Sequence, residues 1–204
     1  MHALIVCNGF PPPDKLLRTE TSEADLVIGA DGGGNILLAH DLVPDVIIGD
    51  LDSFVRPETV AFKLIKDPDQ DTNDLEKALK YALSQNVATC SIVGAFGQRM
   101  DHSLKNLSVM KQFNDCFKEL YFVDEYQKVF LLKEPLDIRL PKGTIISLFP
   151  LSGEVTGITT KGLMYPLDDD VLKNGVRDGT SNETVQEQVH ISHEKGDLLV
   201  FIER

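Results

Sequence analysis

Residues 26–53 have the sequence LVIGADGGGNILLAHDLVPDVIIGDLDS. Two short apolar runs lie in this stretch, and each ends in a turn rich in glycine or aspartate. The runs have the length of buried strands, and a segment of helical or loop character separates them. Strands that alternate with helices form parallel sheets with helices packed on their faces. The stretch therefore predicts an α/β fold with a mainly parallel sheet flanked by helices.

The same pattern extends over residues 1–125, which we expect to form one domain. Apolar residues at helical spacing predict helices at Asp74–Leu83 and His102–Phe113, and Asn73 is suited to cap the first of them. Six short apolar runs predict strands at Ala3–Cys7, Leu26–Gly29, Val46–Ile48, Phe62–Lys66, Ser91–Val93 and Leu120–Val123.

Residues 126–204 have a different pattern, in which short apolar runs are separated by turn residues at close intervals. This spacing predicts a small antiparallel all-β domain, a sandwich or a barrel. The polar stretch 168–187 is too long for a simple hairpin turn, and we expect a long functional loop there.

The chain has 204 residues, with 32 acidic and 20 basic side chains and a formal net charge of −12. This excess argues against a generic nucleic-acid binder, which needs a basic face. No apolar run is long enough to span a membrane, and the amino terminus lacks the basic residues of a signal peptide, so we expect a cytoplasmic protein. The three cysteines form no CxxC pair, and we expect reduced thiols.

Two aspartates, Asp50 and Asp52, directly follow the apolar run Val46–Ile48. Side chains two positions apart in an extended or turning backbone can project to the same side and share a cation. Carboxylate oxygens suit Mg²⁺, which completes its shell with water and substrate phosphates. A turn with two solvated aspartates is the alternative interpretation.

Three further polar clusters are ADGGGN at 30–35, DPDQDTND at 67–74 and GAFGQRMDH at 94–102. Loops at the carboxyl ends of parallel strands can converge on one crevice. Glycine amides and Arg99 suit phosphate, whereas Asp101 suits a substrate amine or a helix cap. His102, taken alone, is more often a structural residue. Because the chain has no Gly-Lys dipeptide, a Walker-type phosphate loop is absent, and metal and glycine backbone would hold a nucleotide.

Five motifs in this order, ADGGGN, PDVIIGDLDS, DQDTNDLEKAL, GAFGQRMDH and GTSNE, resemble those of the thiamine pyrophosphokinase family. The resemblance covers nearly the whole chain. It implies an α/β nucleotide-binding domain, a β-sandwich-like domain at 126–204 that binds thiamine and dimerises, and a homodimer with active sites between its subunits. It also implies Mg²⁺-dependent transfer of a diphosphoryl group from ATP to the hydroxyl of thiamine, which gives thiamine diphosphate and AMP.

The resemblance further implies which residues form the site. The implied catalytic residues and metal ligands are Asp50, Asp52 and Asp74. The residues implied to hold the nucleotide are Asp31, Gly32, Gly33, Asn35, Gln70, Asn73 and Arg99. The residues implied near thiamine are Asp101, His102, Tyr165, Ser181 and Asn182.

The chain departs from the family pattern at two positions. Family members typically have a Gly-Leu-x-Trp segment, whereas this chain has no tryptophan and carries Tyr165 at that place. A tyrosine ring can stack on a substrate ring as tryptophan does, or it can be an ordinary strand aromatic. The family commonly has threonine where Asn73 stands, and both side chains can cap a helix.

Other functions fit parts of the pattern. Another metal-dependent phosphoryl or nucleotidyl transferase would share the aspartate loops and act on a different small alcohol. A regulator that senses Mg²⁺ or Ca²⁺ would use the acidic loops, but it would not need the cluster at residues 99–102. A dinucleotide-binding dehydrogenase is disfavoured because the glycine turn lacks GxGxxG spacing.

Overall fold

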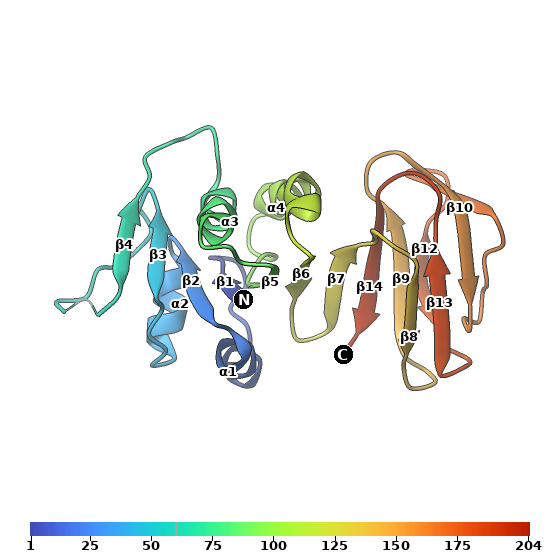
Figure 1. Cartoon of the computed structure of the whole chain (residues 1–204), viewed down its shortest axis with the longest axis horizontal. Coiled ribbons are helices and arrows are strands. Elements are labelled where there is room, and N and C mark those ends of the chain that lie inside the picture. The colour runs from blue at the N-terminus through green and yellow to red at the C-terminus, as the bar shows by residue number, and fades with distance from the viewer. Residues whose placement is uncertain (60) are drawn as a thin grey trace. The chain divides into compact units, whose positions relative to one another are not determined.

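The computed structural model describes residues 1–59 and 61–204. It divides into two compact units, Met1–Glu125 and Tyr126–Arg204, each with its own secondary structure (Figure 1). Within the described ranges, no helix is long and apolar enough to cross a membrane. The cysteines are free thiols: Cys7 and Cys90 are buried, and Cys116 is exposed.

Residues 1–59 and 61–125 form six parallel strands in the order β6-β5-β1-β2-β3-β4. Most of these apolar runs become strands because their side chains are buried on both faces of the sheet, as in other parallel sheets, whereas the edge strand over residues 63–66 is only partly buried. All six predicted strands are confirmed, with ends that differ by at most two residues. The strands are β1 (His2–Val6), β2 (Leu26–Ala30), β3 (Val46–Gly49), β4 (Lys63–Lys66), β5 (Thr89–Val93) and β6 (Glu119–Val123).

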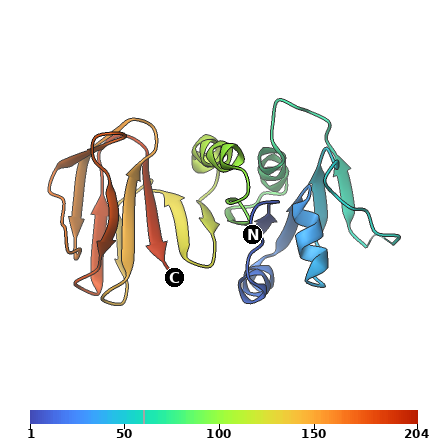
Figure 2. The ribbon, with the colours of Figure 1, turned by 180° about the vertical axis from the view of Figure 1, so that it is seen from behind.

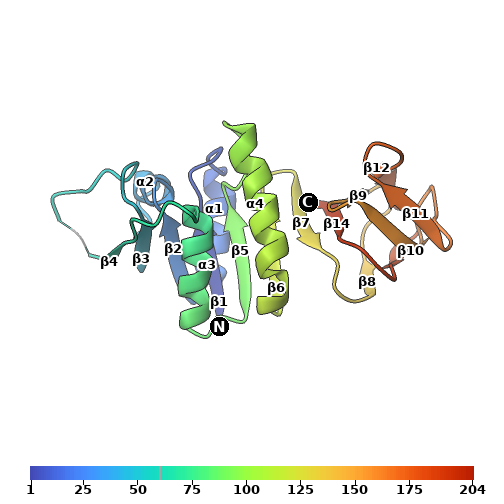
Figure 3. The same ribbon diagram turned by 90° about the horizontal axis from the view of Figure 1, so that it is seen from above.

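Helices cover both faces of this sheet. α3 (Asp74–Ser84) and α4 (Met100–Phe113) lie side by side on one face, as Figures 1 and 3 show. α1 (Asp14–Glu23) and α2 (Gly33–Ala39) lie on the opposite face, toward the bottom of Figures 1 and 2. A short 3₁₀ helix, η1 (Asn114–Cys116), follows α4.

The predicted helices at Asp74 and His102 are confirmed, although α4 begins two residues earlier than expected. The cap at Asn73 is also present, because its side-chain oxygen accepts a hydrogen bond from the Glu76 amide at 3.0 Å. The apolar cluster on the α1 and α2 face contains Leu4, Val6, Leu16, Leu17, Val27, Leu37, Val93 and Val123.

The second unit is built from two antiparallel sheets. One sheet has the order β12-β9-β14-β7 and the other has the order β11-β10-β13-β8. The strands are β7 (Gln127–Leu131), β8 (Leu136–Arg139), β9 (Ile145–Pro150), β10 (Glu154–Lys161), β11 (Asp170–Lys173), β12 (Gly179–Glu183), β13 (Gln188–Ser192) and β14 (Leu198–Glu203).

Both sheets of the second unit contribute to one apolar core. Ile146 and Val200 come from the first sheet, whereas Val155, Leu172 and Ile191 come from the second. The predicted sandwich-like β architecture is therefore confirmed. The expectation of one long loop at 168–187 is wrong, because β11 and β12 occupy parts of this stretch. β12 is polar in sequence and β11 has only Val171 and Leu172 as apolar residues, so pairing with β9 and β10 holds these short strands.

Candidate functional site

Three carboxylates gather at the carboxyl ends of neighbouring strands in the first unit. Asp31 follows β2, while Asp50 and Asp52 follow β3. β2 and β3 are paired in parallel, so their ends lie at the same edge of the sheet. One oxygen from each of the three carboxylates lies within 4.8 Å of the other two. The structure thus brings together the two predicted ligands of β3 and the aspartate of the glycine-rich turn.

The backbone around these aspartates is held in uncommon conformations. Leu51, between Asp50 and Asp52, has a φ of 63°, which side chains other than glycine rarely adopt. The amide of Asp52 then donates a hydrogen bond to Asp50 Oδ1 at 3.2 Å. A Cβ at Gly49 would lie 2.8 Å from Asp31 Cβ and 2.9 Å from Asp74 Oδ1. The carboxylates can approach so closely because position 49 has no side chain.

Among these aspartates, Asp31 gives the strongest indication that a cation binds here. Asp31 is only 3% exposed, its Oδ2 accepts a hydrogen bond from the Ser53 amide at 3.2 Å, and its Oδ1 has no hydrogen-bond partner among the residues that the structure describes. Burial raises the pKa of this carboxyl, and Asp52 raises it further. An unpartnered buried carboxylate oxygen is costly unless something pairs with it. A divalent cation that prefers oxygen ligands fits this group.

Asp74 lies at the first position of α3 and lines the same cavity. It stands outside the group of three mutually close carboxylates. Burial raises its pKa first, and the negative charge of Asp31 raises it next, whereas Lys77 lowers it. The structure therefore places Asp74 beside the three carboxylates and not in the tightest part of the cluster.

A cavity of about 440 Å³ opens beside these aspartates. This size is within the range of small-ligand sites. Of the residues that the sequence motifs single out, the lining includes Asp31, Asp50, Asp52, Asn73, Asp74, Arg99 and His102. Of the residues that the sequence analysis missed, it includes Cys7, Asn8, Gly9 and Asn106. Burial raises the pKa of the Cys7 thiol to about 12, so this thiol is not a nucleophile at neutral pH.

Arg99 and Asp101 form an exposed ion pair at the start of α4. The Arg99 guanidinium donates to both carboxylate oxygens of Asp101, at 3.1 and 2.5 Å. This pairing lowers the pKa of Asp101. Arg99 lines the cavity together with His102, whereas Asp101 is not part of the lining. Asp101 therefore orients the guanidinium in this state of the protein.

Several residues implied to hold a nucleotide are not part of the cavity lining. A Cβ on Gly33 would lie 1.8 Å from the Val6 carbonyl oxygen, so this glycine lets α2 pack against β1. The Asn35 side chain donates to the Ser53 carbonyl at 2.8 Å and accepts from the Val55 amide at 2.9 Å. These contacts fix the loop that follows Asp52.

Two other implied residues pack against the same region. A Cβ on Gly32 would lie 2.3 Å from Asn8 Nδ2, so Gly32 also serves close packing. The Gln70 side-chain amide donates to Asp50 Oδ2 at 3.1 Å. Gln70 thus acts on the cluster through Asp50.

The three residues implied to contact thiamine from the second unit are close to one another there. Asn182 is buried, and its amide accepts from the Tyr165 backbone N–H at 3.1 Å and donates to the Tyr165 carbonyl at 2.8 Å. Tyr165 itself is 67% exposed. Ser181 is exposed, has a φ of 58°, and donates its amide to Ser147 Oγ at 2.9 Å. Asn182 therefore supports the segment that presents the Tyr165 ring.

An amide relay links two loops of the cavity, and sequence reasoning found only its first member. Asn73 Nδ2 donates to Asn106 Oδ1 at 2.9 Å, and Asn106 Nδ2 donates to the Ala95 carbonyl at 2.7 Å. A threonine at position 73 could cap α3 but has no amide to reach Asn106. The relay connects the residue before Asp74 with the loop that leads to Arg99.

The comparisons with known proteins cover both units. Residues 17–122 match the family model described as thiamin pyrophosphokinase, catalytic domain. Residues 132–198 match the model described as thiamin pyrophosphokinase, vitamin B1 binding domain.

Individual relatives give the same result. The thiamine pyrophosphokinase of Bacillus subtilis is 28% identical over 89% of this chain and 88% of its own length. Thiamine pyrophosphokinase 1 of Arabidopsis thaliana is 29% identical over 97% of this chain and 84% of its own length. The crystal structure of the Bacillus subtilis enzyme matches with a TM-score of 0.87 at 27% identity, over 100% of this chain and 99% of that one.

We predict that Asp31→Asn raises the melting temperature of the metal-free protein at pH 7 by about 2–4 °C. The raised pKa means that the folded state binds this proton more tightly than the unfolded chain. The group therefore destabilises the metal-free fold increasingly as pH rises above the unfolded pKa. Thermal unfolding with a chelator at pH 4 and pH 7 measures this, and the gain should shrink at pH 4.

Asp14→Asn is the matched control. The Asp14 carboxyl has a lowered pKa because Arg18 and His40 hydrogen-bond to it. Its contribution to stability is present at pH 7 and is lost as pH falls, so this substitution should not raise the melting temperature. A fall in melting temperature for Asp31→Asn at pH 7 would contradict the assignment of Asp31 as a strained carboxylate.

Proposed function

This chain belongs to the thiamin pyrophosphokinase family, and on that premise we propose that it transfers the diphosphoryl group of ATP to the hydroxyl of thiamine with the help of Mg²⁺. One observation in the site carries the proposal. The buried Asp31 carboxylate has an oxygen with no partner in the described part of the chain, lies within 4.8 Å of two further carboxylates, and opens into a cavity of ligand size. Such a site suits a metal-bound polyphosphate.

The reaction needs accurate placement and charge neutralisation more than a covalent intermediate. The thiamine hydroxyl oxygen forms a bond to the β-phosphorus of ATP, and the bond from that phosphorus to the α,β-bridging oxygen breaks. AMP leaves, and the hydroxyl proton is released. Asp50, Asp52 and Asp74, with Asp31 beside them, would hold Mg²⁺, which would neutralise phosphate charge.

The protein's own residues then have separable roles. We assign Arg99 to a phosphate oxygen and place His102 beside the reacting groups, because both side chains line the cavity. Asp101 orients Arg99, and Gln70 and Asn35 hold the loop that carries Asp50 and Asp52. Gly32 and Gly33 support the nucleotide site by letting the chain pack closely, and Asn73 supports it through its hydrogen bond to Asn106.

We propose that Asp101 and His102 lie near the bound thiamine and that the Tyr165 ring stacks on it. Ser181 and Asn182 would support the segment that carries this ring. Tyr165 supports this because an aromatic ring that is 67% exposed on a braced segment can stack on a planar substrate. We further propose a homodimer in which the second unit of one subunit completes the active site of the other.

The decisive experiment measures the nucleotide product. We expect the purified protein to release AMP from ATP only when thiamine and Mg²⁺ are both present, with one thiamine diphosphate formed for each AMP. A coupled assay that distinguishes AMP from ADP, with thiamine omitted as the control, tests this. Release of ADP, or turnover that ignores thiamine, would favour a transferase that acts on a different alcohol.

We predict that Asp50→Asn lowers kcat at least about 100-fold while the fold stays intact, because a charged metal ligand is lost. Asp71→Asn is the matched control, since Asp71 lies in the other acidic loop, is exposed, and is outside the carboxylate group. Circular dichroism checks the fold, and the AMP assay at saturating Mg²⁺ measures kcat. Near-native activity of Asp50→Asn would remove Asp50 from the metal site.

For Tyr165→Ala we expect the KM for thiamine to rise about tenfold or more while the KM for ATP changes little, and Tyr165→Trp should restore binding. Mixing Tyr165→Ala with Asp50→Asn tests the shared site. Subunit exchange should regenerate some sites with both native residues and therefore recover activity. At a thiamine concentration well below the raised KM, a mixture no more active than the average of its two parents, while mixed dimers form, would mean that each site is built from one subunit.

A further inference from the structure

Lys77 is a buried lysine inside the acidic region, and the proposed reaction gives it no role. It lies on the first turn of α3, and its side chain is only 3% exposed. Its Nζ donates a hydrogen bond to the Asp67 carbonyl oxygen at 3.0 Å and lies 3.5 Å from Asp74 Oδ1. Lysine is almost never fully buried unless it is paired, so these two contacts need an explanation.

A simple helix ion pair does not account for this arrangement. Lys80, three residues after Lys77 on α3, forms such a pair with Glu76 at 3.0 Å, and its side chain is 54% exposed. Lys77 instead gives up its contact with water, and removing an ammonium group from water costs several kcal/mol before any pairing. Its hydrogen bond to Asp67 also reaches ten residues back along the chain.

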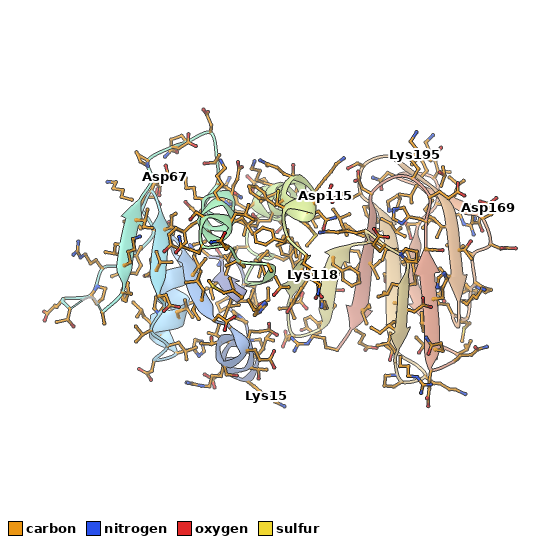
Figure 4. The ribbon with its side chains drawn as sticks, in the orientation of Figure 1. Lys15, Asp67, Asp115, Lys118, Asp169 and Lys195 are labelled. Carbon is orange, nitrogen blue, oxygen red and sulfur yellow. The ribbon has the colours of Figure 1, made fainter. Side chains whose placement is uncertain are left out.

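The two partners of Lys77 are the first and the last residue of the acidic loop 67–74. Asp67 lies just beyond the end of β4, as Figure 4 shows, and Asp74 begins α3. The loop carries four aspartates, which repel one another. The Lys77 ammonium therefore links both ends of this loop. It also sets the position of the Asp74 carboxylate relative to Asp31, Asp50 and Asp52.

We propose that Lys77 is a positioning residue for the metal site, which holds Asp74 and the start of the acidic loop in the arrangement that the cation requires. Lys77 is not part of the cavity lining, so it acts through Asp74 and the loop and does not touch the substrate. The inference rests on the proposed function, because it assumes that the carboxylates bind a divalent cation.

Two effects of removing the ammonium have opposite signs, and this makes the inference testable. Loss of a positive charge would by itself leave the cluster more negative and tighten cation binding. Loss of the Lys77 contacts with Asp67 and Asp74 would let Asp74 and the loop move away, and this would weaken cation binding. A residue that positions the ligands must show the second effect.

The experiment measures binding of Mn²⁺ alone by electron paramagnetic resonance on the metal-free protein. We expect Lys77→Met to raise the Mn²⁺ Kd at least about tenfold and Lys80→Met, the matched control on the same helix, to change it less than twofold. Lys77→Arg, which keeps a buried cation with hydrogen-bond donors, should recover part of the affinity. Circular dichroism at the temperature of the measurement establishes that each variant is folded.

A folded Lys77→Met variant that binds Mn²⁺ as tightly as the native protein, or more tightly, overturns the inference. If Lys77→Met does not fold, Lys77→Gln replaces it, because glutamine removes the charge but keeps a donor for the Asp67 carbonyl. A native protein that binds no Mn²⁺ at this site would overturn the metal site of the proposed function and this inference with it. Native binding with an unchanged variant overturns the inference alone.

Discussion

Repulsion among the carboxylates of Asp31, Asp50, Asp52 and Asp74 is the constraint on which the first unit depends. Two carboxylates about 5 Å apart near a protein surface repel by on the order of 3 kcal/mol, so the fold must hold them against that force. It does so with rigid backbone: Asp31 and Asp50 directly follow buried parallel strands, and Gly49 leaves room for the side chains of Asp31 and Asp74. A flexible loop would move its charges apart.

The repulsion among these carboxylates explains why several neighbouring side-chain and backbone donors contact them. The Ser53 amide reaches Asp31, the Gln70 amide reaches Asp50, and the Lys77 ammonium reaches Asp74. Each donor stabilises the charged form of one carboxylate without filling the space between them. The amide relay through Asn106 adds a link to the loop before Arg99. The cavity is therefore framed by loops that are coupled to one another as well as to the sheet.

Much of this arrangement is predictable from sequence because its causes are local. Buried parallel strands need apolar runs, and aspartates that end adjacent runs must lie at one edge of the sheet. The bounds of α1 are harder to predict, since its ten residues contain only two buried apolar side chains, Leu16 and Leu17. β11 and β12 escape local prediction for a different reason, because they become strands by pairing with β10 and β9.

Side-chain roles are less predictable than side-chain positions. The Asp101 carboxylate suits a contact with substrate, yet it pairs with Arg99. This pairing depends on the rotamers of both side chains. Lys77 gives only a weak signal, a lysine three residues after an aspartate on a helix, which usually indicates an exposed pair. Its burial follows from the course of residues 67–74, and a sequence pattern does not specify that course.

The support that Asn182 gives to Tyr165 has a consequence for selectivity. Both backbone polar groups of Tyr165 are already hydrogen-bonded to one buried side chain, so the segment need not become ordered when a ligand arrives. A tyrosine ring has only two side-chain torsions to fix, and little conformational entropy is therefore lost on stacking. A surface prepared in this way favours flat, rigid ring systems, and it gains little from flexible molecules that must themselves be ordered.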